Sequence, residues 1–190
     1  MSWKKEISQI KLREKLAKQQ GGSEAVKVQH DKGRLTLRER IDLLLDKDSF
    51  DEIGKVAGGA EYDDEGNLLS LTPANFILGF GKIEGQDVIV GGEDFTVKGG
   101  SPNAAGLRKS VYTEDLAVKH KFPLVRLHEG GGGSVAGPSK EKKGYGGDPV
   151  FARSRFKSVA QTLKEVPVVS AALGPVAGLP ASRFVGSHFR

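Results

Sequence analysis

Two glycine-rich segments of the chain have the composition of a site that binds a carbonyl or phosphate oxygen. Residues 130–133 are four consecutive glycines shortly after the apolar stretch 123–127, and residues 174–181 follow the apolar stretch 167–173. Because glycine has no side chain to keep a ligand away, such loops expose backbone N–H groups to a carbonyl or phosphate oxygen. Ligands of α/β folds bind just beyond the carboxyl ends of strands. These amides predict a site for a negatively charged oxygen; a mobile, solvated loop is the alternative for each segment.

Other chemical motifs fail on their context. Residues 131–136 fit the G-x-G-x-x-A pattern of dinucleotide-binding folds, but Gly137 and Pro138 follow where the helix should continue. Pro138 also takes the place of the phosphate-binding lysine of a P-loop, and the region around Ser134 lacks the second glycine of a nucleophile elbow. The absence of cysteine excludes thiol chemistry, and the four histidines lack metal-ligand spacing. We therefore expect no bound metal.

Composition indicates one soluble globular domain. The chain has 190 residues, 37% of them hydrophobic, and a formal net charge of +5. Residues 1–40 carry 11 basic and five acidic side chains, so the rest of the chain is close to neutral and a nucleic-acid surface is not expected. No apolar run approaches the roughly 20 residues of a membrane span, and the N-terminus lacks a signal-peptide core. We expect a cytoplasmic protein that does not enter a membrane.

The N-terminal 35 residues read as a basic helical arm and link, and residues 36–190 as the domain proper. Residues 3–20 have apolar side chains at helical spacing, and we expect this stripe to pack on the body of the protein or on a neighbouring subunit. Residues 23–32 read as a polar link. The stripe consists of Trp3, Ile7, Ile10 and Leu16.

The first elements of the domain carry recognisable start and turn signals. Thr36 and Glu39 fit a capping box, which predicts a helix with Leu37, Ile41 and Leu44 buried. Residues 76–83 and 88–90 flank the turn 84–87 and predict a β-hairpin.

The later elements alternate between helices and strands. Helices are expected after Ser101-Pro102 and after Asp148-Pro149, with strands over 123–127 and 167–173, the second buried on both faces. A last helix from near Gly178 is expected to run to the end of the chain. This order favours a layered α/β domain. The expected buried residues are Leu107, Val111 and Val118 of the first helix and Phe156, Val159 and Leu163 of the second, while Phe184, Val185 and Phe189 of the last helix should be uncovered.

Four ordered segments resemble one family. Residues 30–46, with residues 49–52, closely resemble the opening signature of the carboxyltransferase (beta) subunits of biotin-dependent acyl-CoA carboxylases, such as the propionyl-CoA and related carboxylases. Residues 94–101, 130–133 and 174–178 resemble successive landmarks of that family in its order. The resemblance implies a crotonase-like fold of repeated β-β-α units wound into a superhelix, here with an N-terminal helical extension. It also implies that this chain is the N-terminal, acyl-CoA-binding half of a larger subunit.

The resemblance also implies the site residues. The backbone amides of Gly178 and Leu179 match the family's oxyanion hole, although many relatives have glycine at the second position. Glu129 stands near a family aspartate, and either a salt bridge or acid/base work would suit it. The residues implied to bind substrate are Gly131, Gly132 and Gly133 beside the thioester, and Val97, Lys98, Gly99 and Gly100, with Lys98 or the basic arm near phosphate.

By this resemblance the chain moves a carboxyl group from carboxybiotin to the α-carbon of a short acyl-CoA such as propionyl-CoA or acetyl-CoA. The biotin belongs to a partner, a biotin carboxyl carrier or biotin carboxylase subunit, and the subunit forms a homo-oligomer. The isolated chain is expected to be inactive. Two alternatives stay open: an acyl-CoA decarboxylase or hydratase of the same superfamily, and a non-catalytic CoA-binding or assembly fragment.

Overall fold

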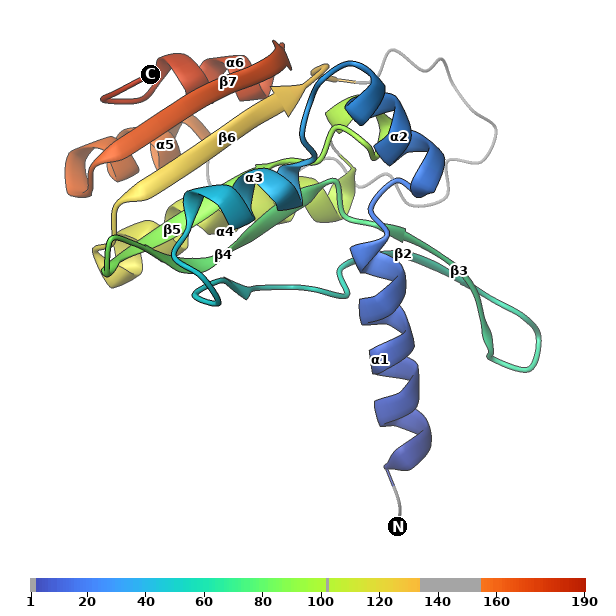
Figure 1. The fold of residues 1–190 in the computed structure, drawn as a ribbon. Helices are drawn as coiled ribbons and strands as arrows, with labels where there is room; N and C mark the ends of the chain where they lie inside the picture. Colours follow the sequence, from blue (N-terminus) through green and yellow to red (C-terminus); the bar gives the residue numbers. More distant parts are fainter. Residues whose placement is uncertain (1–2, 102, 134–154) are drawn as a thin grey trace.

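The computed structural model describes residues 3–101, 103–133 and 155–190. The described elements form one five-stranded sheet, a separate two-stranded sheet and helices on both faces of the larger sheet (Figure 1). In chain order they are α1 (Lys4–Lys18), α2 (Ser23–Asp31), α3 (Leu37–Leu44), β1 (Asp51–Glu52), β2 (Gly58–Tyr62), β3 (Leu68–Pro73), β4 (Phe76–Ile83), β5 (Gln86–Glu93), the 3₁₀ turn η1 (Lys98–Gly100), α4 (Ala104–His120), β6 (Leu124–Gly130), α5 (Arg155–Glu165), β7 (Val168–Val176) and α6 (Leu179–Val185).

The large sheet has the strand order β1-β4-β5-β6-β7. The predicted hairpin is confirmed as β4 and β5, joined by Glu84 and Gly85, whose φ angles of 49° and 78° are those of a type I′ turn. Strands β5, β6 and β7 are parallel. Their carboxyl ends therefore share one edge of the sheet, and the segments that follow each of them are brought together there.

Each face of the sheet has its own hydrophobic core. On one face α4 and α5 cover Leu78, Ile89 and Leu124, and on the other face α3 covers Ile77 and Val90 (Figure 1). The predicted capping box of α3 is confirmed: Glu39 N donates to Thr36 Oγ1 and Thr36 N donates to Glu39 Oε2. Leu37 and Ile41 are buried as expected, and Leu44 is partly buried.

The N-terminal arm differs from its prediction in two ways. Residues 23–31 form the helix α2, not a polar link, because Glu24, Ala25 and Lys27 are good helix formers and Gly22 caps them with a φ of 93°. Most of the apolar stripe of α1 is exposed: Trp3, Ile7 and Ile10 are 67%, 50% and 51% exposed, whereas Leu16 is partly buried. Helix α1 contacts β3 and extends away from the large sheet (Figure 1). Packing on a neighbouring subunit stays a prediction, as does a domain boundary at residue 35.

Helix α4 begins later than predicted and buries a different face. Its cap is Asn103, whose Oδ1 accepts from Gly106 N at 2.7 Å; Pro102 lies outside the described residues. The expected apolar face, Leu107, Val111 and Val118, is half-buried, and smaller side chains such as Thr113 face the sheet. The residues of α4 that face β5 are small because the helix lies close to that strand. A Cβ at Gly91 would come within 2.9 Å of Thr113 Cγ2. The Thr113 hydroxyl donates to the Lys109 carbonyl, which makes its burial tolerable.

The last two strands also differ from the prediction. β6 continues past residue 127 through His128 and Glu129 to Gly130. β7 is buried on one face only, since Val169 and Leu173 are 39% and 37% exposed on this edge strand. The predicted loop 134–147 and the helix start at Asp148 lie outside the described residues.

The helices beside these strands were predicted less well. In α5, Phe156 is 70% exposed, and the fully buried residues are Ser158 and Thr162 in place of Val159 and Leu163, which are partly buried. α6 ends at Val185, because residues 187–190 return to β7, where Ser170 N donates to Phe189 O and His188 N donates to Val168 O. Val185 and Phe189 are exposed as expected, and Phe184 is half-buried.

The buried amine of Lys109 on α4 should make the stability of the fold depend on pH. Burial lowers its pKa from 10.5 to about 8, against the attraction of Glu52, whose Oε1 lies 3.8 Å from Nζ. Between pH 8 and 10.5 the unfolded chain keeps this proton and the folded chain loses it, so the free energy of unfolding should rise with pH, by up to ~3 kcal/mol.

Urea denaturation at pH 7.5 and pH 10 measures this rise. Lys109→Met should remove it, whereas Lys119→Met, on the exposed face of the same helix, should leave it in place. An identical pH dependence in the wild type and in Lys109→Met would contradict the assignment.

Candidate functional site

The segments that follow β5, β6 and β7 meet at the carboxyl edge of the sheet. Gly131 N donates to Gly99 O at 2.9 Å, which joins the segment after β6 to η1. Ala177 N donates to Gly130 O at 3.0 Å, which joins the segment after β7 to the end of β6. The three predicted substrate-binding or oxyanion segments, far apart in sequence, therefore form one cluster, which we call the glycine cluster (residues 98–100, 131–133 and 178–179).

Gly132 and Gly178 approach each other so closely that a side chain at either position would be in tight contact with the opposite backbone. A Cβ at Gly132 would lie 3.2 Å from the carbonyl carbon and oxygen of Ala177, and a Cβ at Gly178 would lie 3.2 Å from Gly132 Cα. Both have positive φ, 79° and 64°, a conformation that other residues rarely adopt. The backbone alone therefore forms this surface.

Gly178 is the N-cap of α6, and Leu179 is its first residue. The first amides of a helix have no partner within the helix, so the amides of Gly178 and Leu179 are suited to bind an oxygen that carries negative charge. Pro180 follows in the first turn, where its missing N–H costs nothing. The predicted oxyanion pair thus lies at a position where donors are available.

The segment after β5 is held in a strained turn. Lys98, Gly99 and Gly100 all have positive φ, and Gly100 could not carry a Cβ because Glu129 O would be 2.6 Å away. Lys98 is exposed and lines a groove of about 350 Å³ between η1, the end of α1 and β3. Val97 is buried, so its side chain faces the interior of the protein.

Glu129 is buried as the acceptor of a clamp made by the N-terminal segment. Arg40 Nη1 lies 2.5 Å from Glu129 Oε2 and Arg34 Nη1 lies 3.4 Å from Oε1, while Gln29 Nε2 donates to both oxygens. The Glu129 side chain is 1% exposed. Of the two roles left open by the sequence, the geometry favours the salt bridge, since these partners surround the carboxylate. The clamp holds the end of β6 and therefore the residues that follow it.

The opposite face of β6 carries a second buried charge network, which anchors α6. Glu114 Oε1 of α4 accepts from Arg126 Nη2 at 2.8 Å and from Arg183 Nε of α6 at 2.7 Å. Burial lowers the pKa of Arg126 to about 10, against the attraction of Glu114. The amide-bearing start of α6 is thereby fixed to both α4 and β6.

Two further buried residues near the glycine cluster were missed at the sequence level. Glu93 ends β5 and His128 lies on β6, and they form a pair with His128 Nδ1 3.0 Å from Glu93 Oε2. The alternation of side chains along a strand could have revealed this pair in the sequence. Once β6 is extended to Gly130, this alternation places Arg126 and His128 toward α4 and α6, and Glu129 toward the clamp.

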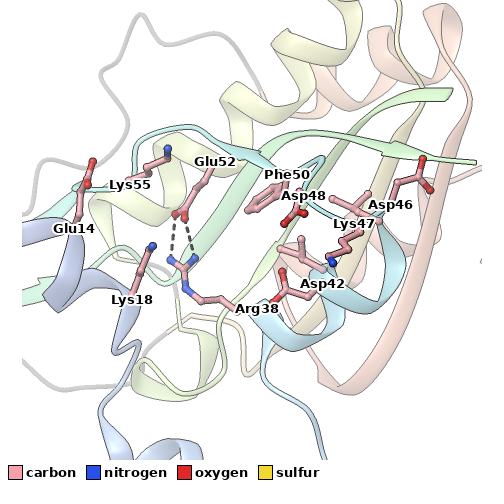
Figure 2. Close-up of a pocket in the computed structure, with 12 residues that line it drawn as sticks. Glu14, Lys18, Arg38, Asp42, Asp46, Lys47, Asp48, Phe50, Glu52 and Lys55 are labelled. Carbon is pink, nitrogen blue, oxygen red and sulfur yellow. Dashed lines mark hydrogen bonds and ion pairs between the residues drawn. The ribbon is translucent and has the colours of Figure 1, made fainter. Parts of the chain in front are cut away.

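A groove of about 740 Å³ lies elsewhere, between α1, α3 and the β1 segment. Figure 2 shows Arg38 facing Glu52 in a bidentate pair, with Lys18 and Lys55 together on one side of it. The two nitrogen–oxygen distances of the pair are 2.8 and 3.3 Å. Its lining includes no residue of the glycine cluster, and it mixes acidic with basic side chains.

Among the described residues, no group of His, Asp or Glu side chains is arranged to hold a metal ion. None of the described helices has the length and apolarity needed to cross a membrane.

Comparison with known proteins decides the family. The model of the carboxyl transferase domain matches residues 28–182, which include the clamp, the glycine cluster, and Glu114 and Arg126 of the second charge network. The chain belongs to the carboxyl transferase domain family. A 33% identical relative is the propionyl-CoA carboxylase beta chain of Roseobacter denitrificans, aligned over 90% of this chain and 32% of that protein. Another, 32% identical, is the methylmalonyl-CoA decarboxylase subunit alpha of Veillonella parvula, aligned over 88% of this chain and 32% of that protein.

The carboxyl transferase fold is also seen in solved structures. The hexameric transcarboxylase 12S, with methylmalonyl-coenzyme A bound, superposes with a TM-score of 0.73 at 24% identity, over 100% of this chain and 36% of that one. This confirms the predicted crotonase-like α/β fold. The chain spans about a third of the length of these carboxyl transferase relatives.

The clamp around Glu129 predicts a large stability loss when one partner is removed. Arg40→Met should lower the free energy of unfolding by ~3 kcal/mol, because the buried carboxylate loses its shortest ion pair. Adding Glu129→Gln should recover part of that loss, since no charge is then stranded. Urea denaturation measures both.

The control for the clamp is an exposed ion pair. Lys82→Met breaks the contact between Lys82 and Asp87, whose side chains are about half exposed, and should cost no more than ~0.5 kcal/mol. Equal losses in Lys82→Met and Arg40→Met would contradict the structural role of the clamp.

Proposed function

We propose that this chain is the acyl-CoA-binding half of a carboxyltransferase (beta) subunit, which transfers a carboxyl group from carboxybiotin to the α-carbon of a short acyl-CoA such as propionyl-CoA or acetyl-CoA. The observation that carries the proposal is the glycine cluster, where backbone amides meet at the carboxyl edge of the sheet. Family membership supports it, and so does the methylmalonyl-coenzyme A named in the transcarboxylase 12S structure.

The chemistry needs an acceptor for negative charge. Removing a proton from the carbon next to a thioester places charge on the thioester oxygen, and preorganised amides aimed at that oxygen stabilise it by roughly 3–4 kcal/mol per donor. We assign that role to the amides of Gly178 and Leu179, with Gly131, Gly132 and Gly133 beside the thioester. Carboxybiotin, the donor substrate, supplies the carboxyl group and is carried by a biotin carboxyl carrier partner. The subunit works in the cytoplasm as a homo-oligomer.

A related decarboxylation is the second candidate. The relative from Veillonella parvula is a methylmalonyl-CoA decarboxylase subunit, and loss of CO2 from such a substrate would leave the same charge on the same thioester oxygen. The glycine cluster would serve both directions. The hydratase alternative has less support, because Glu129, its candidate acid or base, is enclosed by Arg34, Arg40 and Gln29.

The proposed position of the CoA phosphates predicts an effect of Lys98. Lys98→Ala should weaken the binding of acetyl-CoA or propionyl-CoA about 3- to 10-fold at low salt, because an exposed cation beside the groove is lost. Isothermal titration calorimetry on the complete encoded protein measures this. Lys47→Ala, which removes an exposed lysine of the other groove, should bind as the wild type does. No saturable binding by the wild type at millimolar ligand would contradict the proposal.

The oxyanion assignment predicts loss of turnover without loss of the fold. Gly178→Val should lower kcat for carboxyl transfer at least 100-fold, since a side chain at this position meets Gly132 and a valine cannot easily adopt the positive φ. The decarboxylation of methylmalonyl-CoA or malonyl-CoA in the presence of free biotin is the assay. Turnover that does not depend on biotin would favour the decarboxylase, and wild-type turnover in Gly178→Val would contradict the assignment.

A further inference from the structure

The mechanism above leaves a buried carboxylate–imidazole pair without a role. Glu93 and His128 have side chains that are 6% and 1% exposed, and His128 Nδ1 lies 3.0 Å from Glu93 Oε2. Phe184 of α6 contacts the imidazole edge-on, with the ring centroids 6.4 Å apart. The other ring nitrogen, His128 Nε2, is buried and has no hydrogen-bond partner among the described residues. Burying two titratable groups is costly, so a pair of this kind calls for a function.

Glu93 lies behind the proposed oxyanion hole. It lines a small pocket together with Gly100 of η1 and with Leu179 and Pro180 at the start of α6. A Cβ at Gly130 would be 3.4 Å from both Glu93 Cγ and Pro180 Cγ, which shows how tightly these backbones and side chains adjoin. The pocket therefore places the carboxylate of Glu93 beside the first residues of α6, and Arg183 of the same helix also belongs to its lining.

The size of this pocket suits the reacting end of a substrate and excludes the rest of it. Its volume is about 20 Å³, room for a group the size of a water molecule or a methyl group. Phe76 and Leu107 make part of the lining apolar. A small acyl α-carbon fits such a space, and the nucleotide part of CoA does not.

Glu93 differs from the other buried carboxylates in what surrounds it. Glu129 is held by two arginines and a glutamine, and Glu114 by Arg126 and Arg183. For Glu93 the described ion-pair partner is the imidazole of His128, which engages one oxygen. Among the described residues Glu93 therefore has no arginine ion pair, although Arg126 lies near enough for its charge to act on Glu93.

We propose that Glu93 is the general base that removes the α-proton of the acyl thioester, and that His128 is the residue that positions it. This inference rests on the proposed function. The α C–H bond breaks, the proton goes to Oε1 of Glu93, which His128 does not bind, and the electron pair passes into the enolate whose oxygen is held by the amides of Gly178 and Leu179. After the enolate carbon takes the carboxyl group, the proton returns from Glu93 to the leaving nitrogen of the donor. Without a donor, the proton returns to the α-carbon.

Because the proton can return to the α-carbon when no donor is present, proton removal by Glu93 can be measured separately from carboxyl transfer. In D2O, with acetyl-CoA or propionyl-CoA and no carboxyl donor, the complete encoded protein should introduce deuterium at the α-carbon, which NMR or mass spectrometry detects. Glu93→Gln should reduce the exchange rate about 100-fold or more while acyl-CoA binding changes less than twofold. Glu52→Gln, which alters an equally buried, ion-paired carboxylate outside the pocket, should exchange at the wild-type rate.

His128 is tested by a split between kinetic constants. His128→Leu should lower kcat for carboxyl transfer about 10-fold and leave KM for the acyl-CoA unchanged. His128→Gln, whose amide can still donate to Glu93, should restore part of the lost kcat. Glu93→Asp keeps the negative charge but shortens the side chain, and it should also slow the deuterium exchange. This variant provides the test if Glu93→Gln fails to fold.

The outcomes distinguish this inference from the proposed function. If the wild type transfers carboxyl groups but Glu93→Gln and Glu93→Asp exchange deuterium at the wild-type rate, the assignment of Glu93 is overturned and the proposed function stands. A wild type that transfers carboxyl groups without any donor-free exchange also overturns it. If the wild type binds no acyl-CoA, the proposed function itself has failed.

Discussion

The close approach of Gly132 to Gly178 is the constraint on which the site depends. The parallel arrangement of β6 and β7 brings the chain segments after them to one edge. Both positions have positive φ, and a Cβ at either would be in tight contact with the opposite backbone. A helix that starts at this contact presents its first amides beside the backbone of residues 131–133. The electrostatic role that we propose for Gly178 and Leu179 is therefore a property of backbone geometry.

Two buried charge networks on opposite faces of β6 hold this geometry. Because successive residues of a strand point to opposite faces, Glu129 meets Arg34 and Arg40 of the N-terminal segment on one side. On the other side Arg126 meets Glu114 and Arg183, which ties α6 to α4. Breaking a buried ion pair costs several kcal/mol, so each network resists displacement of the loop that it supports. The N-terminal arm is thus part of the support of the site.

The sequence predicted the parts of this structure that local chemistry determines. The capping box of Thr36 and Glu39, the β4–β5 hairpin and the glycine segments after β6 and β7 all follow from short-range signals. It did not predict what depends on distant partners. Glu129 and His128 were assigned to a loop because the strand pattern ends in polar residues, and their partners lie 35 to 100 residues away. Likewise, the polar face of α4 is buried because Gly91 allows close packing, which periodicity alone cannot reveal.

The central claim is that the glycine cluster polarises the carbonyl of an acyl thioester. The most direct measurement is the infrared stretching frequency of that carbonyl in [1-¹³C]acetyl-CoA bound to the complete encoded protein, compared with the free thioester in water. Donation by the Gly178 and Leu179 amides predicts a lower frequency in the bound state and loss of that decrease in Gly178→Val. A bound carbonyl that absorbs at the solution frequency, or a decrease that persists in Gly178→Val, would contradict the account.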